Sequence, residues 1–198
     1  AIGAIAKSFP IYFVIIAVGV GIGAATNSCI GNLLGVKKIK VGHAGTLDPL
    51  ANGLLILCTG KMTKEIDQFQ AAEKEYIATI KLGATTPSYD GEMVEDRFYA
   101  TKHINEDLIK TTLQTFTGEI QQYPPMFSAL KVGGKKLYEI ARKGNEVAVK
   151  PRAITISGLE ILELDMPYIK LRVTCSKGTY IRSLAYDIGK SLKSGAWL

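Results

Sequence analysis

The sequence has few of the residues that build metal sites and disulfide frameworks. Its three cysteines, Cys29, Cys58 and Cys175, lie far apart and form no Cys-x-x-Cys pair, and its only histidines are His43 and His103. Zinc sites and disulfide-rich domains need more ligands at closer spacing. We therefore expect no metal, no disulfide framework and a reducing, cytoplasmic location.

Charge is missing altogether from residues 8–36, where the stretch FPIYFVIIAVGVGIGAA is almost entirely apolar. Such a run is close to the length of a membrane-spanning helix and also fits the core of a signal peptide. Lys7 is the only charge before it, and the downstream cysteines and basic residues argue against export. We expect a buried strand or helix here and no membrane partner, with an anchor over residues 9–25 as the alternative.

The 198 residues carry a positive charge that is unevenly distributed. The formal net charge is +6, and residues 126–198 hold 13 Lys and Arg against 6 Asp and Glu, whereas residues 1–125 hold 11 against 12. In SALKVGGKKLYEIARKG, five cations surround Tyr138, a mixture that suits RNA phosphates with an occasional stacked base. A solvated helix face is the equally weighted alternative. The cations are Lys131, Lys135, Lys136, Arg142 and Lys143.

The pattern of apolar residues predicts an α+β domain with a mixed, mostly antiparallel sheet and flanking helices. In EYIATIKLGA, apolar and polar residues alternate, as in a strand with one buried face. Leucines and isoleucines recur at helical spacing elsewhere. The expected elements are a buried strand at LLILCTG, the strand at EYIATIKLGA, a turn at TTPSYDGE, a helix from Asn105 to Phe116, a short helix from Lys136 to Lys143, strands at AITISGLEILEL and YIKLRVTCS, and a helix at IRSLAYDIGKSL.

One carboxylate, Asp48, stands among glycines and small apolar residues in GHAGTLDPLANG, residues 42–53. An Asp-Pro pair is common in turns, so Asp48 shapes a loop on the simplest reading. The alternative is a carboxylate in a poorly hydrated pocket. There it could act as a nucleophile or a base toward a planar ring.

Three further residues could meet this carboxylate. Tyr76 opens a predicted strand, where a buried strand aromatic is the simplest reading. Tyr180 and Arg182 follow a Lys-Gly turn that leads from a strand into a helix. An arginine at the start of an apolar helix is costly unless it is paired, and a pair with Asp48 would keep that carboxylate ionised at neutral pH.

Four stretches together resemble the TruB family of bacterial tRNA pseudouridine synthases, over residues 33–198. They are VGHAGTLDPLANGLLIL, KEYIATIKLGATTPSYDGE, PPMFSALKVGGKKLYEIARKG and CSKGTYIRSLAYDIG. The resemblance implies the pseudouridine synthase catalytic fold and an enzyme that isomerises a uridine of the T-arm loop of tRNA. It also implies that no metal or organic cofactor is needed, and we expect a monomer.

The resemblance also implies roles for single residues. Asp48 matches the essential aspartate, which attacks the ribose C1′ or the base or helps to form a glycal. Tyr76 matches the tyrosine that stacks on the flipped base, and Arg182 the arginine that pairs with the aspartate. Tyr180 matches a pocket aromatic, and His43 a histidine that contacts the flipped-out region. Lys135 and Lys136 are the expected phosphate contacts of the basic half.

The two ends of the chain depart from the family pattern. Family members begin with a strand and a Lys-Pro-x-Gly-x-Thr-Ser motif, which residues 1–32 lack, and they continue beyond the GAWL end into further sequence. We therefore divide the chain into an atypical segment, 1–32, and a catalytic domain, 33–198, with the C-terminal part of the family's chain absent. An RNA-binding chaperone that has kept the pocket and lost turnover is the alternative function.

Overall fold

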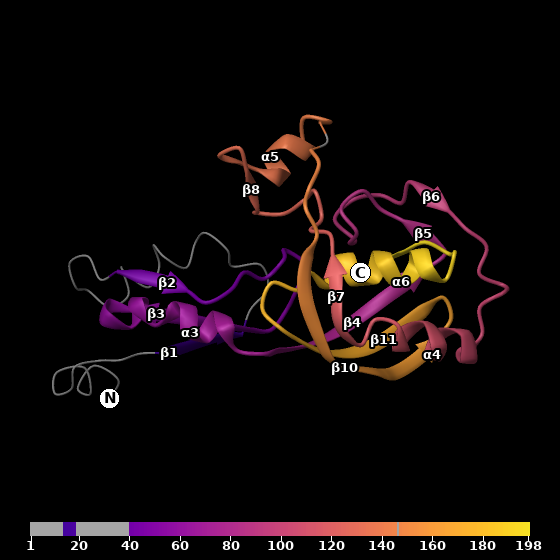
Figure 1. Ribbon diagram of the computed structural model, residues 1–198, viewed down its shortest axis with the longest axis horizontal. Coiled ribbons are helices and arrows are strands. Elements are labelled where there is room, and N and C mark those ends of the chain that lie inside the picture. The colour runs from indigo at the N-terminus through magenta and orange to yellow at the C-terminus, as the bar shows by residue number, and fades with distance from the viewer. Residues whose placement is uncertain (1–13, 19–39, 146) are drawn as a thin grey trace. The chain divides into compact units, whose positions relative to one another are not determined.

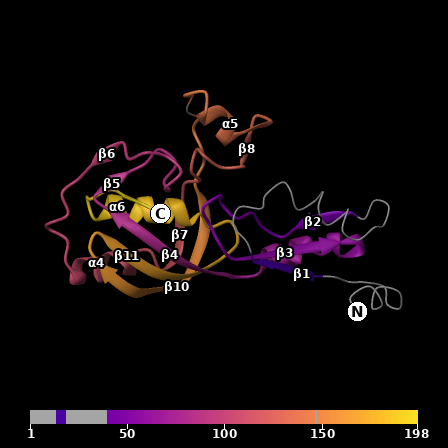
Figure 2. The ribbon, with the colours of Figure 1, turned by 180° about the vertical axis from the view of Figure 1, so that it is seen from behind.

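A computed structural model describes residues 14–18, 40–145 and 147–198 of the chain. It divides into two compact units, residues 1–72 and residues 73–198. Figures 1 and 2 show the elements of both units from opposite sides. Each unit is described by itself below.

The first unit contains a three-stranded antiparallel sheet with the order β1-β3-β2. The strands are β1 (Val14–Val18), β2 (Val41–His43) and β3 (Leu54–Thr59), followed by the 3-10 helix η1 (Gly60–Lys64) and helix α3 (Ile66–Ala71). β3 confirms the strand expected at LLILCTG, and its last three residues are buried. It forms the centre of the sheet and pairs with both of the other strands.

Part of the uncharged N-terminal run is a strand. β1 pairs with β3 along one edge of the first unit's sheet, with Val14 opposite Cys58 and Val18 opposite Leu54. Within the described ranges, no helix is long and apolar enough to cross a membrane. Residues 1–13 and 19–39 lie outside the described residues, so the boundary expected at residue 32 stays a prediction.

The second unit is built on a five-stranded antiparallel sheet with the order β12-β4-β11-β10-β7. The two strands expected at AITISGLEILEL and YIKLRVTCS are confirmed and form an antiparallel pair, and helix α6 begins at Ile181, its expected start. The strands are β4 (Lys74–Leu82), β7 (Gly118–Gln122), β10 (Arg152–Asp165), β11 (Tyr168–Cys175) and β12 (Ala196–Trp197), and the helix is α6 (Ile181–Ser191).

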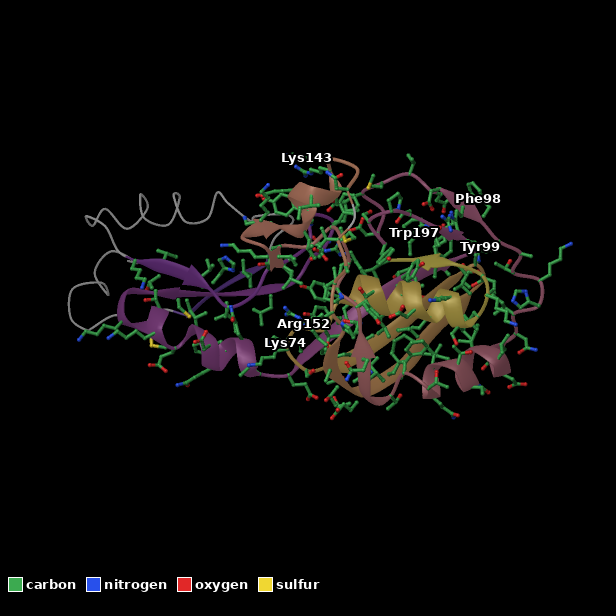
Figure 3. All side chains as sticks on the ribbon, turned by 45° about the horizontal axis from the view of Figure 1, so that its top comes forward. Lys74, Phe98, Tyr99, Lys143, Arg152 and Trp197 are labelled. Carbon is green, nitrogen blue, oxygen red and sulfur yellow. The ribbon has the colours of Figure 1, made fainter. Side chains whose placement is uncertain are left out.

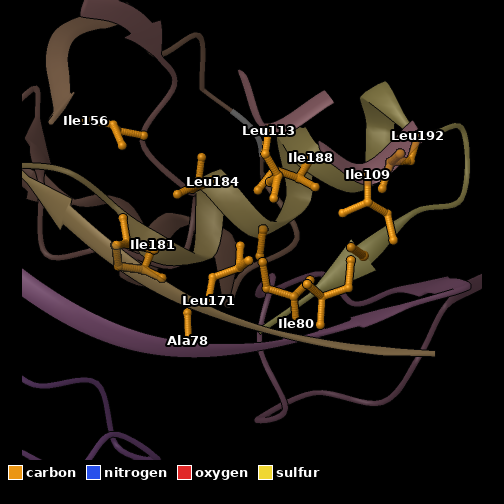
Figure 4. Close-up of a cluster of buried hydrophobic side chains, with 14 of the residues drawn as sticks. Ala78, Ile80, Ile109, Leu113, Ile156, Leu171, Ile181, Leu184, Ile188 and Leu192 are labelled. Atoms are coloured by element: carbon orange, nitrogen blue, oxygen red, sulfur yellow. The ribbon is translucent and has the colours of Figure 1, made fainter. Parts of the chain in front are cut away.

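The core of the second unit lies between one face of this sheet and the apolar side of α6 (Figure 4). On β4, Ala78 and Ile80 are buried whereas Ile77 is 53% exposed, which confirms the predicted alternation. From α6, Leu184 and Ile188 are buried against the sheet. Burying this apolar area is the main favourable contribution to the stability of the unit.

Two predicted helices are confirmed with shorter bounds, and several short elements were not predicted. Asn105 caps helix α4 (Glu106–Gln114) by accepting a hydrogen bond of 2.8 Å from the Leu108 amide. Helix α5 (Leu137–Ala141) ends before Gly144, whose φ is 73°. The unpredicted elements are η1, α3, β2, β7, β12 and two short pairs, β5 (Ala84–Thr85) with β6 (Arg97–Phe98) and β8 (Lys131–Val132) with β9 (Lys135–Lys136).

Candidate active site

Arg182 is the most deeply buried of the predicted site residues. It lies in the first turn of α6 and is only 7% exposed. Its Nη1 atom lies 3.4 Å from Oδ2 of Asp90 and donates to the carbonyls of Ser88, at 3.3 Å, and Phe127, at 3.0 Å. A guanidinium is tolerated at such depth because an opposite charge and several acceptors surround it.

Asp90 was missed by sequence reasoning, which treated TTPSYDGE only as a turn. The carboxylate is as deeply buried as the arginine, with 8% of its side chain exposed. It accepts hydrogen bonds from Ser88 Oγ, at 2.5 Å, and from the amide of Glu92, at 3.0 Å. The sequence did carry one clue: an arginine in the apolar helix that begins at Ile181 needs an acid as its partner. Asp90, which belongs to the same unit as Arg182, is that acid.

The turn that carries Asp90 is itself held in place. Thr86 Oγ1 donates to the Asp90 carbonyl at 2.8 Å. Tyr89 has a φ of 64°, a conformation uncommon for a residue with a side chain. Its ring stacks on Tyr186 of α6, with 4.1 Å between ring centroids. This turn is therefore attached to α6 at two places, through Arg182 and through Tyr186.

Tyr180 is positioned through its backbone by a buried glutamine. Gln122, at the end of β7, is 2% exposed. Its Oε1 accepts from the Tyr180 amide at 2.8 Å, and its Nε2 donates to the Tyr180 carbonyl at 3.1 Å. Ser183 Oγ adds a bond of 2.8 Å to the carbonyl of Tyr123. The start of α6 is thus joined to β7 and to the loop that follows it.

Tyr76 lies where the buried face of β4 meets solvent. It shares its strand face with Ala78 and Ile80 but is 36% exposed, because the core stops before this end of the strand. Its backbone pairs with Val173 of β11. A tyrosine half-open at the edge of a core can present its ring to a planar ligand.

Asp48 and His43 belong to the first unit. The Asp48 carbonyl accepts a hydrogen bond of 2.9 Å from the Ala51 amide, so Asp48 opens a turn with Pro49 at its second position, as the Asp-Pro pair predicts. His43 ends β2, and its Nδ1 is hydrogen-bonded to the Gly45 carbonyl. Because Asp48 and Arg182 lie in different units, their pairing stays a prediction.

The basic segment around Tyr138 forms the pair β8 and β9 followed by α5. The Tyr138 ring is flanked by Lys136 Nζ at 5.4 Å and Arg142 Cζ at 5.5 Å from its centroid. Lys135 is exposed and lines a hollow of about 340 Å³ together with Lys143. Two of the five cations therefore contact an aromatic ring, and Lys135 faces open space.

Three titratable side chains outside the predicted site have pKa values that burial raises. Burial raises the pKa of the Cys58 and Cys175 thiols, which keeps both protonated at neutral pH and makes them poor nucleophiles. Burial also raises the pKa of Asp187 in α6 to about 6, partly opposed by Lys190. Within the described ranges, no cluster of three His, Cys, Asp or Glu side chains could hold a metal.

Comparison with known proteins identifies relatives over most of the chain. Residues 32–181 match the model of the TruB family pseudouridylate synthase N-terminal domain. The tRNA pseudouridine synthase B of Parabacteroides distasonis is 63% identical over 165 residues, which are 83% of this chain and 70% of the relative. That of Bacteroides fragilis is 62% identical over 163 residues, covering 82% of this chain and 70% of the relative.

Solved structures agree with the fold. A chain from a Cbf5–Nop10–Gar1 complex superposes with a TM-score of 0.68 at 28% identity, over 94% of this chain and 45% of that one. A chain from an H/ACA ribonucleoprotein bound to a substrate RNA containing 2′-deoxyuridine gives 0.64 at 26% identity, over 93% and 44%. The chain thus spans less than half the length of these two. The predicted α+β fold is confirmed, and the chain belongs to the TruB family of pseudouridylate synthases.

Proposed function

We propose that this chain isomerises one uridine in the T-arm loop of tRNA to pseudouridine, with Asp48 as the essential carboxylate. The observation that carries the proposal is the continuous family match over residues 32–181, which includes Asp48, Tyr76 and Tyr180. The name of the relatives, tRNA pseudouridine synthase B, supports tRNA as the substrate. Those relatives carry the name of an enzyme, which gives no support to a binding protein without turnover.

The reaction is balanced without redox chemistry. The bond from N1 of uracil to the ribose C1′ breaks, a bond from C5 to C1′ forms, and the proton on C5 leaves while N1 gains one. Asp48 attacks C1′ or the base, or assists formation of a glycal. Each of these routes needs an ionised carboxylate, and each is completed by side chains alone.

Tyr76 and Arg182 have supporting roles in this proposal. The half-exposed ring of Tyr76 stacks on the flipped uracil and accepts the C5 proton. Arg182 supplies the positive charge that pairs with the Asp48 carboxylate in the proposed site. Asp90 does not touch the substrate: its hydrogen bonds to Ser88 and Glu92 hold it at 3.4 Å from the guanidinium. Asp90 is thus a positioning residue.

RNA binding must offset the cost of unstacking the target base, which is a few kcal/mol. Phosphate contacts by exposed lysines provide this free energy. Lys135, exposed beside the hollow next to α5, and Lys136 are the candidates on the basic segment. We place the protein in the bacterial cytoplasm, because tRNA lies there and the buried Cys58 and Cys175 are free thiols. We further propose a monomer that works without a cofactor.

The proposal is tested by asking which of two RNA stem-loops the chain modifies. The chain is incubated with two stem-loop RNAs, the T arm and the anticodon arm, each carrying tritium at C5 of its uridines. Release of tritium from the T arm alone is the expected result, because the proposed substrate is one T-loop uridine. Equal release from both, or release only from the anticodon arm, would contradict it.

A further inference from the structure

The core-facing side of the second unit's sheet continues past the core into basic residues. Side chains two positions apart on a strand share a face, so Lys74 lies on the same side of β4 as Tyr76 and the buried Ala78. On β10, Arg152 shares its side with the buried Ile154. Figure 3 shows Lys74 and Arg152 at the same end of the sheet. Each cation thus comes just before the buried part of its strand.

Arg152 lies beside Gln122, the residue that binds the backbone of Tyr180 in the candidate site. It stands opposite Gln122 in the pairing of β10 with β7, and opposed residues project from the same face of a sheet. The buried amide of Gln122 binds both the N–H and the C=O of Tyr180. Arg152 therefore lies on the sheet face from which Tyr180 is held, next to the residue that holds it.

A third cation reaches this end of the sheet from the turn after β11. The Ser176 amide donates to the Thr155 carbonyl at 2.8 Å, and the Thr155 amide donates to Ser176 Oγ at 2.9 Å. These bonds fix the turn against β10. Lys177, the next residue, is exposed and lies three residues before Tyr180.

The cations elsewhere on these strands are already neutralised. Lys170 is 3.5 Å from Glu163, and Arg172 is 2.5 Å from Glu160. Both lie on the sheet face opposite the core. By contrast, neither Arg152 nor Lys177 forms an ion pair with any residue in the ranges that the structure describes.

We propose that Arg152 and Lys177, together with Lys74, bind the RNA phosphates next to the flipped uridine. The inference rests on the proposed function and adds a second phosphate site, separate from Lys135 and Lys136 on the basic segment. Exposed cations beside a half-open tyrosine are the combination that binds a single strand with one unstacked base. These residues hold the backbone while the base enters the site, and they take no part in bond breaking.

The test compares two double variants that each remove two positive charges from the same sheet. One is Arg152→Gln with Lys177→Gln, and the matched control is Lys170→Gln with Arg172→Gln. The Kd for an unlabelled T-arm stem-loop is measured across a salt series, and the rate of pseudouridine formation is measured in a single turnover at saturating RNA. Thermal melting checks that both variants are folded.

For the first variant, the slope of log Kd against log salt should decrease by about 1.4, since each single-stranded phosphate contact contributes about 0.7. Its Kd at about 0.1 M salt should rise tenfold or more, with the saturated rate unchanged within about twofold. The control should keep the wild-type slope. If the first variant melts early, Lys177→Gln alone should still lower the slope by about 0.7, because its side chain is exposed.

An unchanged slope in the first variant, or an equal loss in the control, would overturn the inference. Failure of the wild-type chain to form pseudouridine, with the slopes still differing as expected, has a different meaning. It would overturn the proposed enzyme and leave the phosphate site standing.

Discussion

At the scale of single residues, the buried Arg182 depends on Asp90. Removing one partner of a buried ion pair leaves the other charge uncompensated, at a cost of about 3 kcal/mol or more. Asparagine at position 90 keeps a side-chain oxygen for Ser88 Oγ and the Glu92 amide but loses the charge that faces the guanidinium.

We predict that Asp90→Asn lowers kcat by about a hundredfold, since a displaced reactive group loses its alignment, while KM changes only a few-fold. Its melting temperature should also fall. Asp165→Asn, at the exposed last residue of β10, is the matched control and should change neither quantity. A kcat equal to that of the wild type would show that Asp90 does not position Arg182 for catalysis.

Asp187 should make the stability of the folded state depend on pH, and this effect can be tested without an activity assay. Burial raises its pKa from 3.8 to about 6, so the folded state binds its proton more tightly than the unfolded chain does. Its contribution to stability is therefore largest below about pH 4 and is lost as the pH rises through about 6.

Asp187→Asn should remove that loss. We expect the melting temperature of the variant to exceed that of the wild type by about 2–4 °C near neutral pH, and by almost nothing below pH 4. Melting curves from about pH 3 to pH 8 measure this difference. The same gain at every pH would mean that the carboxyl does not titrate as its burial predicts.

At the scale of elements, β7 and α6 are joined by one buried amide. Gln122 satisfies two backbone groups of Tyr180, and each buried group left without a partner costs about 1–3 kcal/mol. We predict that Gln122→Leu lowers the melting temperature by several degrees and reduces turnover, because the start of α6 is released. Gln121→Leu, at an exposed position one residue earlier, should do neither, and equal effects would contradict the prediction.

The same elements indicate how far the sequence predicts the fold. Period-two alternation located β4, and helical spacing located α4 and α6, because both patterns follow from burial of one face. β7 was missed because GEIQQ has one apolar residue and is defined by pairing with β10, a contact distant in sequence. The two-residue strands were missed for the same reason.

The site was predictable to a similar extent. Arg182 was expected to need an acid, and the structure supplies Asp90, which belongs to a turn some ninety residues earlier in the chain. Nothing local in TTPSYDGE distinguishes a buried aspartate from an exposed one, since both fit the same turn. Pairings between distant segments require the tertiary fold.

At the scale of the whole molecule, the positive charge should make the affinity for RNA depend on the salt concentration. Replacing Lys135 and Lys136 with glutamine should weaken RNA binding and reduce the salt slope by about 0.7 for each phosphate that is no longer neutralised. Lys110→Gln, whose side chain is paired with Glu106 at 2.6 Å on α4, is the control. A slope that does not change would mean that Lys135 and Lys136 contact no phosphate when RNA is bound.

The central claim is that Asp48 carries the chemistry. Asparagine at this position keeps the shape of the side chain and loses its charge, so RNA should bind with nearly unchanged affinity while isomerisation stops. The most direct measurement is tritium release from a T-arm stem-loop labelled at uridine C5, comparing the wild-type chain with Asp48→Asn. We predict release by the wild type and none by the variant, and substantial release by the variant would remove Asp48 from the mechanism.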